Sequence, residues 1–364
     1  MKENTTVCKI EKWIFYILQK LVKGKFVITE EMKLYNSVVL CRVFILMDKI
    51  HALLVQGSYA NQRALFYEMR HLKMEYSVTN KSYSLTKHSS YLFPSQIQVD
   101  TTIRKISGLL GSSRNELHIF PNSKGFLSGA IALVHHNSSS NAIDCLREFP
   151  DGWCIPGSTE YLNQFKFENL GAQYIVVIEK HGIFKRLLED RFVHHLPSIL
   201  ICGLGYPSIA TKFLFQRIAR ELRLPCLGLV DYNPHGLALL QTYRSSLAKE
   251  ASDLDNQLSC SSWRESTPLH IYWLGLHFSQ LSQLNLWDKF RKPLTRRDRV
   301  LLTKLRNQLQ TKAGRNLAVL EQELNAMQNG KVELQAIYSL GHSYLSRTYL
   351  PSAIFHYEDL VPRL

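Results

Sequence analysis

Two stretches of the sequence decide the fold, and they read Leu229-Val230-Asp231-Tyr232-Asn233-Pro234-His235-Gly236-Leu237 and, earlier in the chain, Tyr174-Ile175-Val176-Val177-Ile178-Glu179-Lys180. Each contains an apolar run that ends in an acidic residue. Runs of β-branched and aliphatic residues are typical of strands buried on both faces, and such strands occur in parallel sheets. Because functional groups of parallel sheets gather at the carboxyl ends of the strands, we expect Glu179 and Asp231 to lie at one edge of a sheet.

Two carboxylates at neighbouring strand ends predict a site for a hard cation. Mg²⁺ is usually held by one or two carboxylates and completes its coordination with water and phosphate oxygens. Glu179 and Asp231 therefore point to magnesium and to phosphodiester chemistry. A calcium-binding loop starting at Asp231 is disfavoured, because Pro234 interrupts it and Thr242 stands where a bidentate glutamate is needed.

The composition is typical of a globular protein, and its excess of basic residues favours a polyanionic partner. A length of 364 residues is enough for two domains, and a content of 45% apolar and 20% charged residues is typical of a globular protein. The 44 Lys and Arg against 30 Asp and Glu favour nucleic acid as the partner, with an anionic membrane surface second. The 7 cysteines form no Cys-x-x-Cys pair, and their odd number argues for a reducing compartment. No apolar run is long enough for a membrane span.

The N-terminal part has the pattern of a helical DNA-binding domain. Helical apolar stripes predict helices over 9–22, 36–55, about 59–73 and 95–110. Short strand patterns over 117–120 and 126–134 flank a turn-forming segment and predict a β-ribbon. Helices closed by such a ribbon indicate a winged helix-turn-helix, so the expected fold class is α+β for this part.

The C-terminal part alternates strands and helices. Strands are expected over 174–179, 198–202, 226–231 and 270–274, and helices over 182–191, 207–223 and 236–244. This alternation predicts βαβ units, a parallel sheet and an α/β class. A basic segment over 291–306 is either a solvated helix face or a phosphate-contacting one. The expected organisation is an N-terminal partner-docking or capping helix in 1–30, a winged-helix domain in 31–141, and a metal-binding domain with a C-terminal extension in 142–364.

Several motifs, in order along the chain, resemble the meiotic double-strand-break transesterases of the Spo-eleven type, relatives of the topoisomerase VI A subunit. The motifs are Gln62-Arg63-Ala64-Leu65-Phe66-Tyr67, Ser95-Gln96, Lys124-Gly125, Val177-Ile178-Glu179-Lys180-His181-Gly182-Ile183-Phe184, Gly205-Tyr206-Pro207, Asp231-Tyr232-Asn233-Pro234-His235-Gly236-Leu237, Trp273-Leu274-Gly275-Leu276, Pro293-Leu294-Thr295 and Lys331-Val332-Glu333-Leu334. Each motif alone is weak, but their order and spacing make the match specific. The resemblance covers most of the chain.

The resemblance implies a winged-helix (CAP-like) catalytic domain followed by a Toprim domain. It implies that Tyr67 attacks a DNA phosphate and becomes joined to the 5′ end of the broken strand, while Arg63 stabilises the charge on the phosphate oxygens. It also implies Mg²⁺ held by Glu179, Asp231 and Asn233. Asn233 stands where the family commonly has Asp, which lowers the charge of the site.

The family works on double-stranded DNA as a two-fold dimer. By this resemblance Tyr67 of one protomer meets Glu179 and Asp231 of the other, and the further partners are meiotic accessory proteins and a B-like subunit. The expected localisation is the nucleus, with no membrane association. Leu204 departs from the family, which usually has Lys before Gly-Tyr-Pro, so a phosphate contact is missing or rearranged.

Three other functions stay open from the sequence. The chain could be a topoisomerase VI A subunit that cuts and reseals DNA with an ATPase B subunit. It could be a water-using Toprim nuclease, which needs no tyrosine, or a divergent DNA-binding scaffold without catalysis. Each candidate site residue also has a purely structural interpretation. Tyr67 could be a packing tyrosine, and Asp231 and Asn233 could form a turn and cap the following helix.

Overall fold

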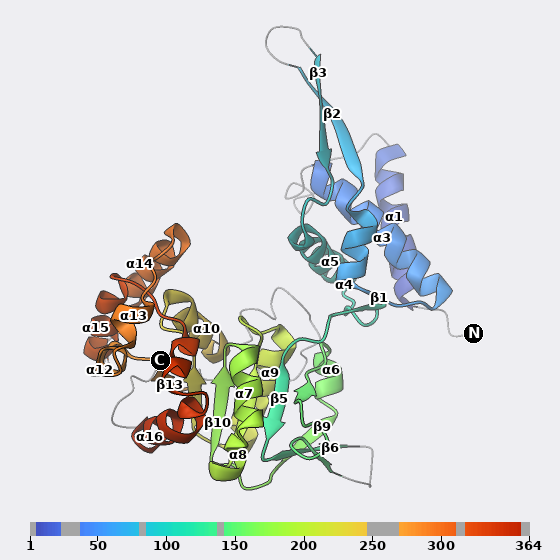
Figure 1. Cartoon of the computed structure of the whole chain (residues 1–364). Helices are drawn as coiled ribbons and strands as arrows, with labels where there is room; N and C mark the ends of the chain where they lie inside the picture. Colours follow the sequence, from blue (N-terminus) through green and yellow to red (C-terminus); the bar gives the residue numbers. More distant parts are fainter. Residues whose placement is uncertain are drawn as a thin grey trace. The chain divides into compact units, whose positions relative to one another are not determined.

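The computed structural model describes residues 5–22, 37–79, 85–136, 142–245, 269–310 and 317–357 (Figure 1). The chain divides into two compact units, with the division between Asn122 and Ser123. Among its described residues, the first unit comprises 5–22, 37–79 and 85–122. The second comprises 123–136, 142–245, 269–310 and 317–357.

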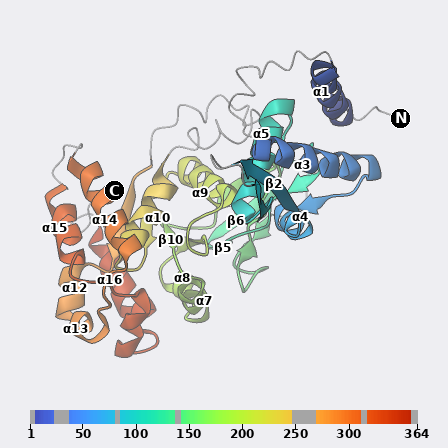
Figure 2. The ribbon, with the colours of Figure 1, turned by 90° about the horizontal axis from the view of Figure 1, so that it is seen from above.

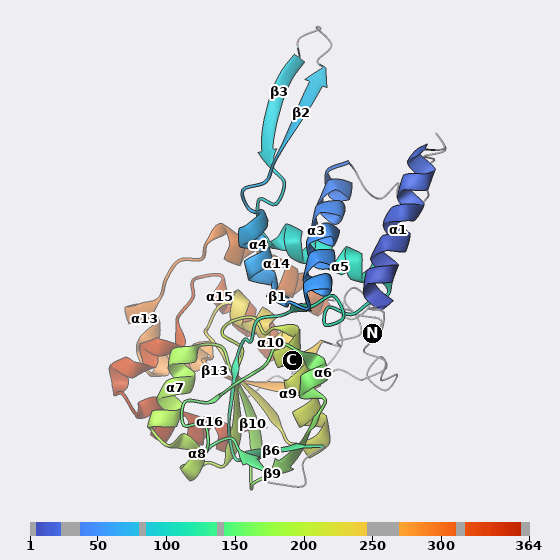
Figure 3. The ribbon, with the colours of Figure 1, turned by 90° about the vertical axis from the view of Figure 1, so that its right-hand side faces the viewer.

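The first unit is a helical domain with a long β-ribbon (Figures 1 and 3). Its elements are α1 (Thr5–Val22), α3 (Ser37–Gln56), β1 (Ala60–Asn61), α4 (Gln62–Met69), β2 (Lys73–Thr79), β3 (Leu85–Tyr91), α5 (Gln96–Leu110) and β4 (Ile119–Phe120). The apolar stripes of the helices meet in one core, to which Ile50, Leu65 and Ile103 belong. The predicted helices over 9–22, 36–55 and 95–110 are therefore confirmed.

The helix α4 is shorter than the predicted span 59–73. It begins after Asn61, whose side chain accepts a hydrogen bond from the Ala64 N–H at 2.7 Å. Upstream, Ala60 and Asn61 pair in parallel with β4. Downstream the chain enters β2 at Lys73, where the backbone is extended.

The predicted ribbon over 117–134 is wrong, and the real ribbon lies elsewhere. β4 pairs with β1, and β5 (Phe126–Gly129) belongs to the large sheet of the second unit. The ribbon is instead β2 paired with β3 in antiparallel register from Lys73↔Tyr91 to Thr79↔Leu85. A strand signal was present in the alternating Met74, Tyr76 and Val78, but the helical stripe before them masked it.

The second unit is built on a six-stranded sheet with the order β13-β12-β10-β11-β5-β8. Its strands are β5, β8 (Trp153–Cys154), β10 (Tyr174–Ile178), β11 (Ser198–Cys202), β12 (Cys226–Leu229) and β13 (Ile271–Gly275). The four predicted strands β10, β11, β12 and β13 are parallel, as expected. β5 and β8 extend the sheet in antiparallel fashion, so the sheet is mixed. The connecting helices are α7 (His181–Glu189), α8 (Phe192–His195), α9 (Ile209–Leu222) and α10 (Pro234–Arg244).

A smaller antiparallel sheet stands beside the large one. It has the order β7-β6-β9, with β6 (Ile131–His135), β7 (Ile143–Asp144) and β9 (Phe165–Asn169), and α6 (Thr159–Leu162) precedes β9. The chain passes from β5 to β6 through Gly129 and Ala130. Gly129 has φ +111°, and a Cβ there would collide with the Ser198 carbonyl oxygen. Glycine is therefore needed where the backbone leaves one sheet for the other.

The C-terminal helices gather at the β13 side of the large sheet (Figure 2). They are α12 (Phe278–Gln283), α13 (Leu286–Phe290), α14 (Arg296–Gln310), α15 (Leu317–Met327), a 3₁₀ turn (Leu334–Leu340), a π turn (Leu345–Tyr349) and α16 (Leu350–Phe355). Val332 pairs with Tyr232 in an isolated bridge, which brings the segment after α15 to the carboxyl end of β12. Within the described residues, no helix combines the length and apolar content needed to cross a membrane.

Gly125 holds the start of β5 in a conformation that other residues resist. Its φ is +100°, and an added Cβ would lie 2.8 Å from the Cys202 carbonyl oxygen. We expect Gly125→Ala to lower the free energy of unfolding by about 3 kcal/mol, through backbone strain and the clash. Denaturant unfolding checks this, with Gly108→Ala as the control, since a Cβ at Gly108 meets nothing within 4 Å. Equal losses for both variants would contradict the explanation.

His277 should make the stability fall in mild acid. Burial lowers its pKa to about 4, although its Nε2–H donates to the Trp273 carbonyl oxygen at 2.9 Å; Glu323 lies 3.8 Å away. The unfolded histidine titrates near pH 6.5, so the unfolded state binds more protons between the two values and stability is lost as pH falls through that window. From pH 7 to pH 5 the wild type should lose about 2 kcal/mol more than His277→Gln in urea unfolding. Parallel pH profiles would contradict this.

Candidate active site

The two predicted carboxylates lie together at one edge of the large sheet. Glu179 directly follows β10, and Asp231 comes two residues after β12. The two strands are hydrogen-bonded neighbours with Ile178 opposite Leu229. The Asp231 N–H donates to Glu179 Oε2 at 3.0 Å, so the backbone itself sets the spacing of the two side chains.

Asp231 is held from both sides. Its Oδ1 accepts the Leu334 N–H at 2.8 Å, and its Oδ2 lies 2.9 Å from Lys180 Nζ. The Lys180 ammonium also contacts Glu333 Oε2 at 3.0 Å, and Lys292 Nζ contacts the other Glu333 oxygen at 2.6 Å. Asp231, which is only 4% exposed, thus shares the Lys180 ammonium with Glu333, while Lys292 contacts Glu333 alone.

The electrostatics of this cluster are uneven. Burial, with the Asp231 charge beside it, raises the pKa of Glu179 to about 7. Hydrogen bonds from Lys292 and then Lys180 lower the pKa of Glu333 to about 2. Burial opposes the charge of Lys180, but its contacts with Asp231 and Glu333 outweigh this and raise its pKa. Glu179, at the mouth of the sheet, is therefore the carboxyl group of this cluster whose ionisation is least favoured.

Asn233 acts as a helix cap. Its Oδ1 accepts the Gly236 N–H at 2.8 Å, and α10 begins at Pro234. This is the structural role that the sequence left open. An amide oxygen has two lone pairs, so capping leaves one of them for another partner.

The donor chemistry of the site fits a hard cation. Carboxylate oxygens are the ligands that Mg²⁺ prefers. Burial and the Asp231 charge disfavour the ionised form of Glu179, and a bound divalent cation would stabilise that form. In the part of the chain that the structure describes, no group of three or more His, Cys, Asp or Glu side chains is arranged to hold a metal. A cation here would therefore rest on Glu179 and Asp231, with Asn233 as a neutral oxygen donor.

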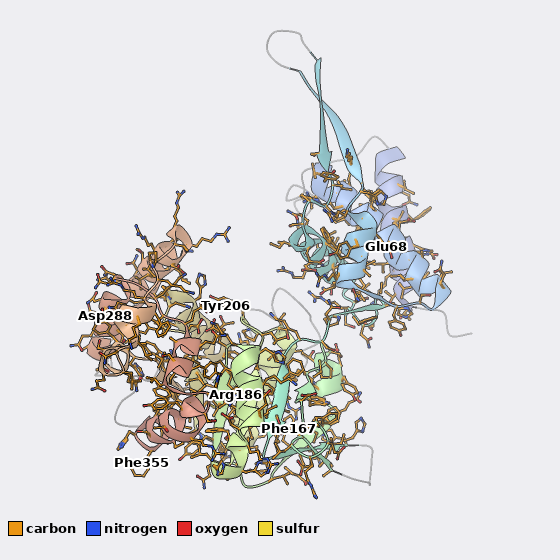
Figure 4. All side chains as sticks on the ribbon, in the orientation of Figure 1. Glu68, Phe167, Arg186, Tyr206, Asp288 and Phe355 are labelled. Atoms are coloured by element: carbon orange, nitrogen blue, oxygen red, sulfur yellow. The ribbon has the colours of Figure 1, made fainter. Side chains whose placement is uncertain are left out.

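A second layer of polar residues lies around these carboxylates. Tyr206, next to α10 in Figure 4, has its hydroxyl 3.3 Å from His235 Nδ1. His235 Nε2 in turn lies 3.5 Å from the buried Asp298. Lys124 Nζ donates to the Tyr206 carbonyl oxygen at 2.7 Å. Leu204, which departs from the family pattern, is 38% exposed and has φ +55°.

Tyr67 and Arg63 lie together on α4 of the first unit. The buried Leu65 and Met69 anchor the helix, which leaves the Tyr67 side chain 55% exposed. The Arg63 guanidinium carbon lies 6.0 Å from the centre of the Tyr67 ring, within the range of a cation–π contact. The expected proximity of a cation to this phenol is therefore present.

Tyr67 also lines a pocket of about 530 Å³. The other lining residues are Arg70, His71, Tyr91, Phe93 and Pro94. Cationic and aromatic side chains thus meet beside an exposed phenol.

Several residues of these sites were not predicted. Lys180 and Glu333 belong to motifs noted in the sequence, but their contact joins positions far apart in the chain. Lys292 carried no signal beyond a basic segment. Arg70 and His71 follow Tyr67 by three and four residues, and this helical spacing could have placed them near it.

Comparisons with known proteins now give the class. Residues 174–354 match the family model of the Toprim domain of Spo11 and the topoisomerase 6 A subunit, and residues 39–119 match the model of the Type IIB DNA topoisomerase. The second unit thus contains a Toprim domain, over residues 174–354. Both matches place the chain in one class, that of the type IIB DNA topoisomerases and their relatives.

Individual relatives make the assignment more specific. The chain is 31% identical to meiotic recombination protein SPO11-2 of Oryza sativa subsp. japonica, over 84% of this chain and 71% of that protein. It is 30% identical to meiotic recombination protein SPO11 of Homo sapiens, over 85% and 69%. It is also 30% identical to the A3 subunit of DNA topoisomerase 6 of Oryza sativa subsp. indica, over 84% of this chain but only 61% of the relative. The chain belongs to the family that unites Spo11 with the topoisomerase 6 A subunit.

Proposed function

We propose that this protein makes the DNA double-strand breaks that start meiotic recombination, by tyrosyl transesterification. The observation that carries the proposal is the pairing of Glu179 and Asp231 at adjacent strand ends of a Toprim domain, in a chain that also presents an exposed tyrosine beside an arginine on α4. The meiotic names of the relatives support the biological role.

In the proposed reaction the Tyr67 phenol oxygen forms a bond to a DNA phosphorus. The phosphorus–O3′ bond breaks, the phenol proton goes to solvent, and the 3′ oxygen takes a proton from solvent and leaves as a hydroxyl. The chain stays linked to the 5′ end, so one phosphodiester is exchanged for another and no water is consumed. Arg63 stabilises the charge on the phosphate oxygens as the bonds change.

Mg²⁺ would be held by Glu179 and Asp231, with Asn233 as a third oxygen donor. When bound, it would supply positive charge that offsets the charge of the phosphate. The residues' own contribution is rigidity, because Asp231 is fixed by the Leu334 N–H and by Lys180. The first unit serves as the winged-helix catalytic domain of this machine.

Assembly follows from the same proposal. A two-fold dimer would place Tyr67 of one protomer with Glu179 and Asp231 of the other, and two such sites cut both strands of a duplex. The proposed partners are double-stranded DNA, meiotic accessory proteins and a topoisomerase VI B-like subunit, and the nucleus is the proposed localisation. The proposed functional organisation keeps a docking or capping helix in 1–30, a winged-helix domain in 31–141 and a metal-binding domain in 142–364, although β5 and β6 pair within the sheets of the second unit.

A second candidate is a topoisomerase VI A subunit that reseals its breaks. The observation in its favour is the 30% identity to the A3 subunit of DNA topoisomerase 6. The two candidates differ in the fate of the break. Conversion of supercoiled DNA to closed, relaxed DNA by the chain with ATP and a B subunit would support resealing. DNA that stays broken would support the meiotic function.

The test of the proposed function is recovery of this chain covalently joined to DNA. Cells that make meiotic breaks are lysed under denaturing conditions, the chain is captured, and attached DNA is labelled. Adducts with a 5′ linkage are the expected result. Their absence, in cells where breaks are confirmed to occur, would favour the scaffold interpretation.

Asn233→Asp should tighten magnesium binding. Asp caps a helix as well as Asn does, so α10 is retained while a third negative charge joins Glu179 and Asp231. We expect the Mg²⁺ concentration for half-saturation, measured by titration calorimetry, to fall roughly tenfold. Asn233→Ser is the control, since it keeps a cap without adding charge. Unchanged affinity in Asn233→Asp would remove this position from the metal site.

A further inference from the structure

The connection between α4 and α5 is unusually large. The two helices pack together, and Gln96 Nε2 donates to the Gln62 carbonyl oxygen at 3.0 Å. Helices of a helix-turn-helix are joined by a turn of about three or four residues. Here the chain instead runs out through β2 and returns through β3. The ribbon is thus an elaboration of the turn beside the helix that carries Tyr67.

The base of the ribbon is firmly built into the first unit. Lys73 pairs with Tyr91, and the Leu92 N–H donates to the Leu72 carbonyl oxygen at 2.8 Å. Leu92 and Phe93 are buried in the helical core, with exposures of 3% and 0%. The direction of the ribbon at its root is therefore set by the core.

Beyond this base the ribbon stands alone as a two-stranded sheet of seven residues a strand. Figures 1 and 3 show it running away from the helices of its own unit. An isolated two-stranded hairpin is marginally stable in water, and its edges expose unpaired backbone groups. A projecting ribbon of this kind needs a partner to cover it.

Two observations favour duplex DNA as that partner. The ribbon begins at the pocket of the nucleophile: Tyr91 lines this pocket with Tyr67, and Lys73 Nζ lies 5.3 Å from the centre of the Tyr91 ring. The described strands also carry Lys73, Lys87 and His88 against a single acidic residue, Glu75. The ribbon is therefore continuous with the surface that receives a phosphodiester under the proposed function, and its charge suits phosphate.

We propose that the ribbon β2–β3 is a DNA-binding arm, which contacts the duplex flanking the phosphate that Tyr67 attacks. The inference rests on the proposed function for the identity of that phosphate. A two-stranded ribbon fits the major groove of B-DNA, which is about 12 Å wide. Seven residues of strand span roughly 23 Å, which corresponds to about seven base pairs of duplex. The arm thus lengthens the DNA site on one side of the break.

The test uses the full chain and a radiolabelled duplex of mixed sequence. One variant replaces residues 74–90 by Gly-Gly, a turn that can join the paired Lys73 and Tyr91. A second variant, Lys73→Ala with Lys87→Ala, keeps the ribbon and removes its two lysine charges. The control is Lys166→Ala with Lys289→Ala, two exposed lysines of the second unit. Thermal unfolding checks that each variant folds.

Hydroxyl-radical footprinting, the salt dependence of affinity and self-association measured by sedimentation are the readouts. The variant without the arm should lose about seven base pairs of protection on one side. The lysine pair should reduce the slope of log affinity against log salt by about two, because each phosphate contact contributes about 0.9. The control pair should leave the footprint length unchanged.

Either of two results would overturn the proposal. One is a footprint and a salt slope that stay at wild-type values in both arm variants. The other is unchanged DNA binding with loss of self-association, which would make the arm a protein-docking element. Tyr67→Phe in the same assays separates the two proposals: it should keep the wild-type footprint while forming no adduct. The two proposals can also fail separately. If deletion of the arm shortens the footprint but the wild-type chain forms no adduct, the DNA-binding role of the arm is supported and the transesterase function is rejected.

Discussion

Covalent protein–DNA adducts are expected to vanish when Tyr67 is replaced by Phe, with at least about a thousandfold loss. The substitution removes only the phenol oxygen, which is the atom that forms the bond to phosphorus. The ring, its contact with Arg63 and the pocket of α4 are retained, and the side chain is 55% exposed, so the fold is not at risk. The measurement is denaturing capture of the chain with end-labelled DNA from cells making meiotic breaks.

The structure offers a matched control for this experiment. Tyr59 is 56% exposed, lies on the same unit and stacks on His118 with ring centres 4.1 Å apart. Tyr59→Phe should leave the adducts at wild-type levels. Adducts that persist in Tyr67→Phe would assign the bond to another tyrosine. Cleavage that persists without any adduct would support the water-using nuclease.

Glu179→Gln should abolish magnesium-dependent cleavage while the chain stays folded. The variant keeps an oxygen that can accept the hydrogen bond of the Asp231 N–H. It removes one of the two carboxylates that could bind a cation at the strand ends. We expect a loss of cleavage of about a thousandfold or more, because charge stabilisation at the reacting phosphate depends on the metal. Asp231→Asn should have an effect of the same order.

Stability separates this effect from unfolding. Burial raises the pKa of Glu179 to about 7, so its charge is unfavourable in the folded protein and a neutral glutamine is tolerated. Thermal unfolding without metal should therefore show Glu179→Gln at least as stable as wild type above pH 7. Glu189→Gln, at an exposed carboxylate on α7, is the control for loss of a charge. Wild-type cleavage rates in Glu179→Gln would remove the carboxylate pair from the reaction.

The two strand-end carboxylates were predictable because their signal is local. An apolar run such as 174–178 can be stable only when buried, and a charged residue that ends it must lie where the sheet meets solvent. Parallel pairing then follows from the intervening helices, and the structure places Ile178 opposite Leu229 as this logic requires. Tyr67 is different, since an isolated tyrosine on a helix has no distinctive pattern and only the resemblance to a family singled it out.

The elements that were mispredicted depended on partners distant in sequence. Phe126–Gly129 has the pattern of a strand wherever it lies, and only its antiparallel pairing with Ser198–Cys202 places it in the large sheet instead of a wing. The ribbon from Lys73 to Tyr91 was hidden because a helix stripe and a strand alternation overlap there. Its existence rests on cross-strand pairing, which a local pattern does not contain.

Residue order alone was thus sufficient for the alternating strands and helices of the Toprim domain, and for the meeting of Glu179 with Asp231 at its edge. Burial of apolar runs and the geometry of parallel strands impose these features from short stretches of chain. Folding in three dimensions was needed to bring Lys180 to Glu333, to fix Asp231 with the Leu334 N–H, and to raise the ribbon at the pocket of Tyr67. Such contacts join residues far apart in the chain, and a side chain's charge, burial and partners are set by the neighbours that the whole fold supplies.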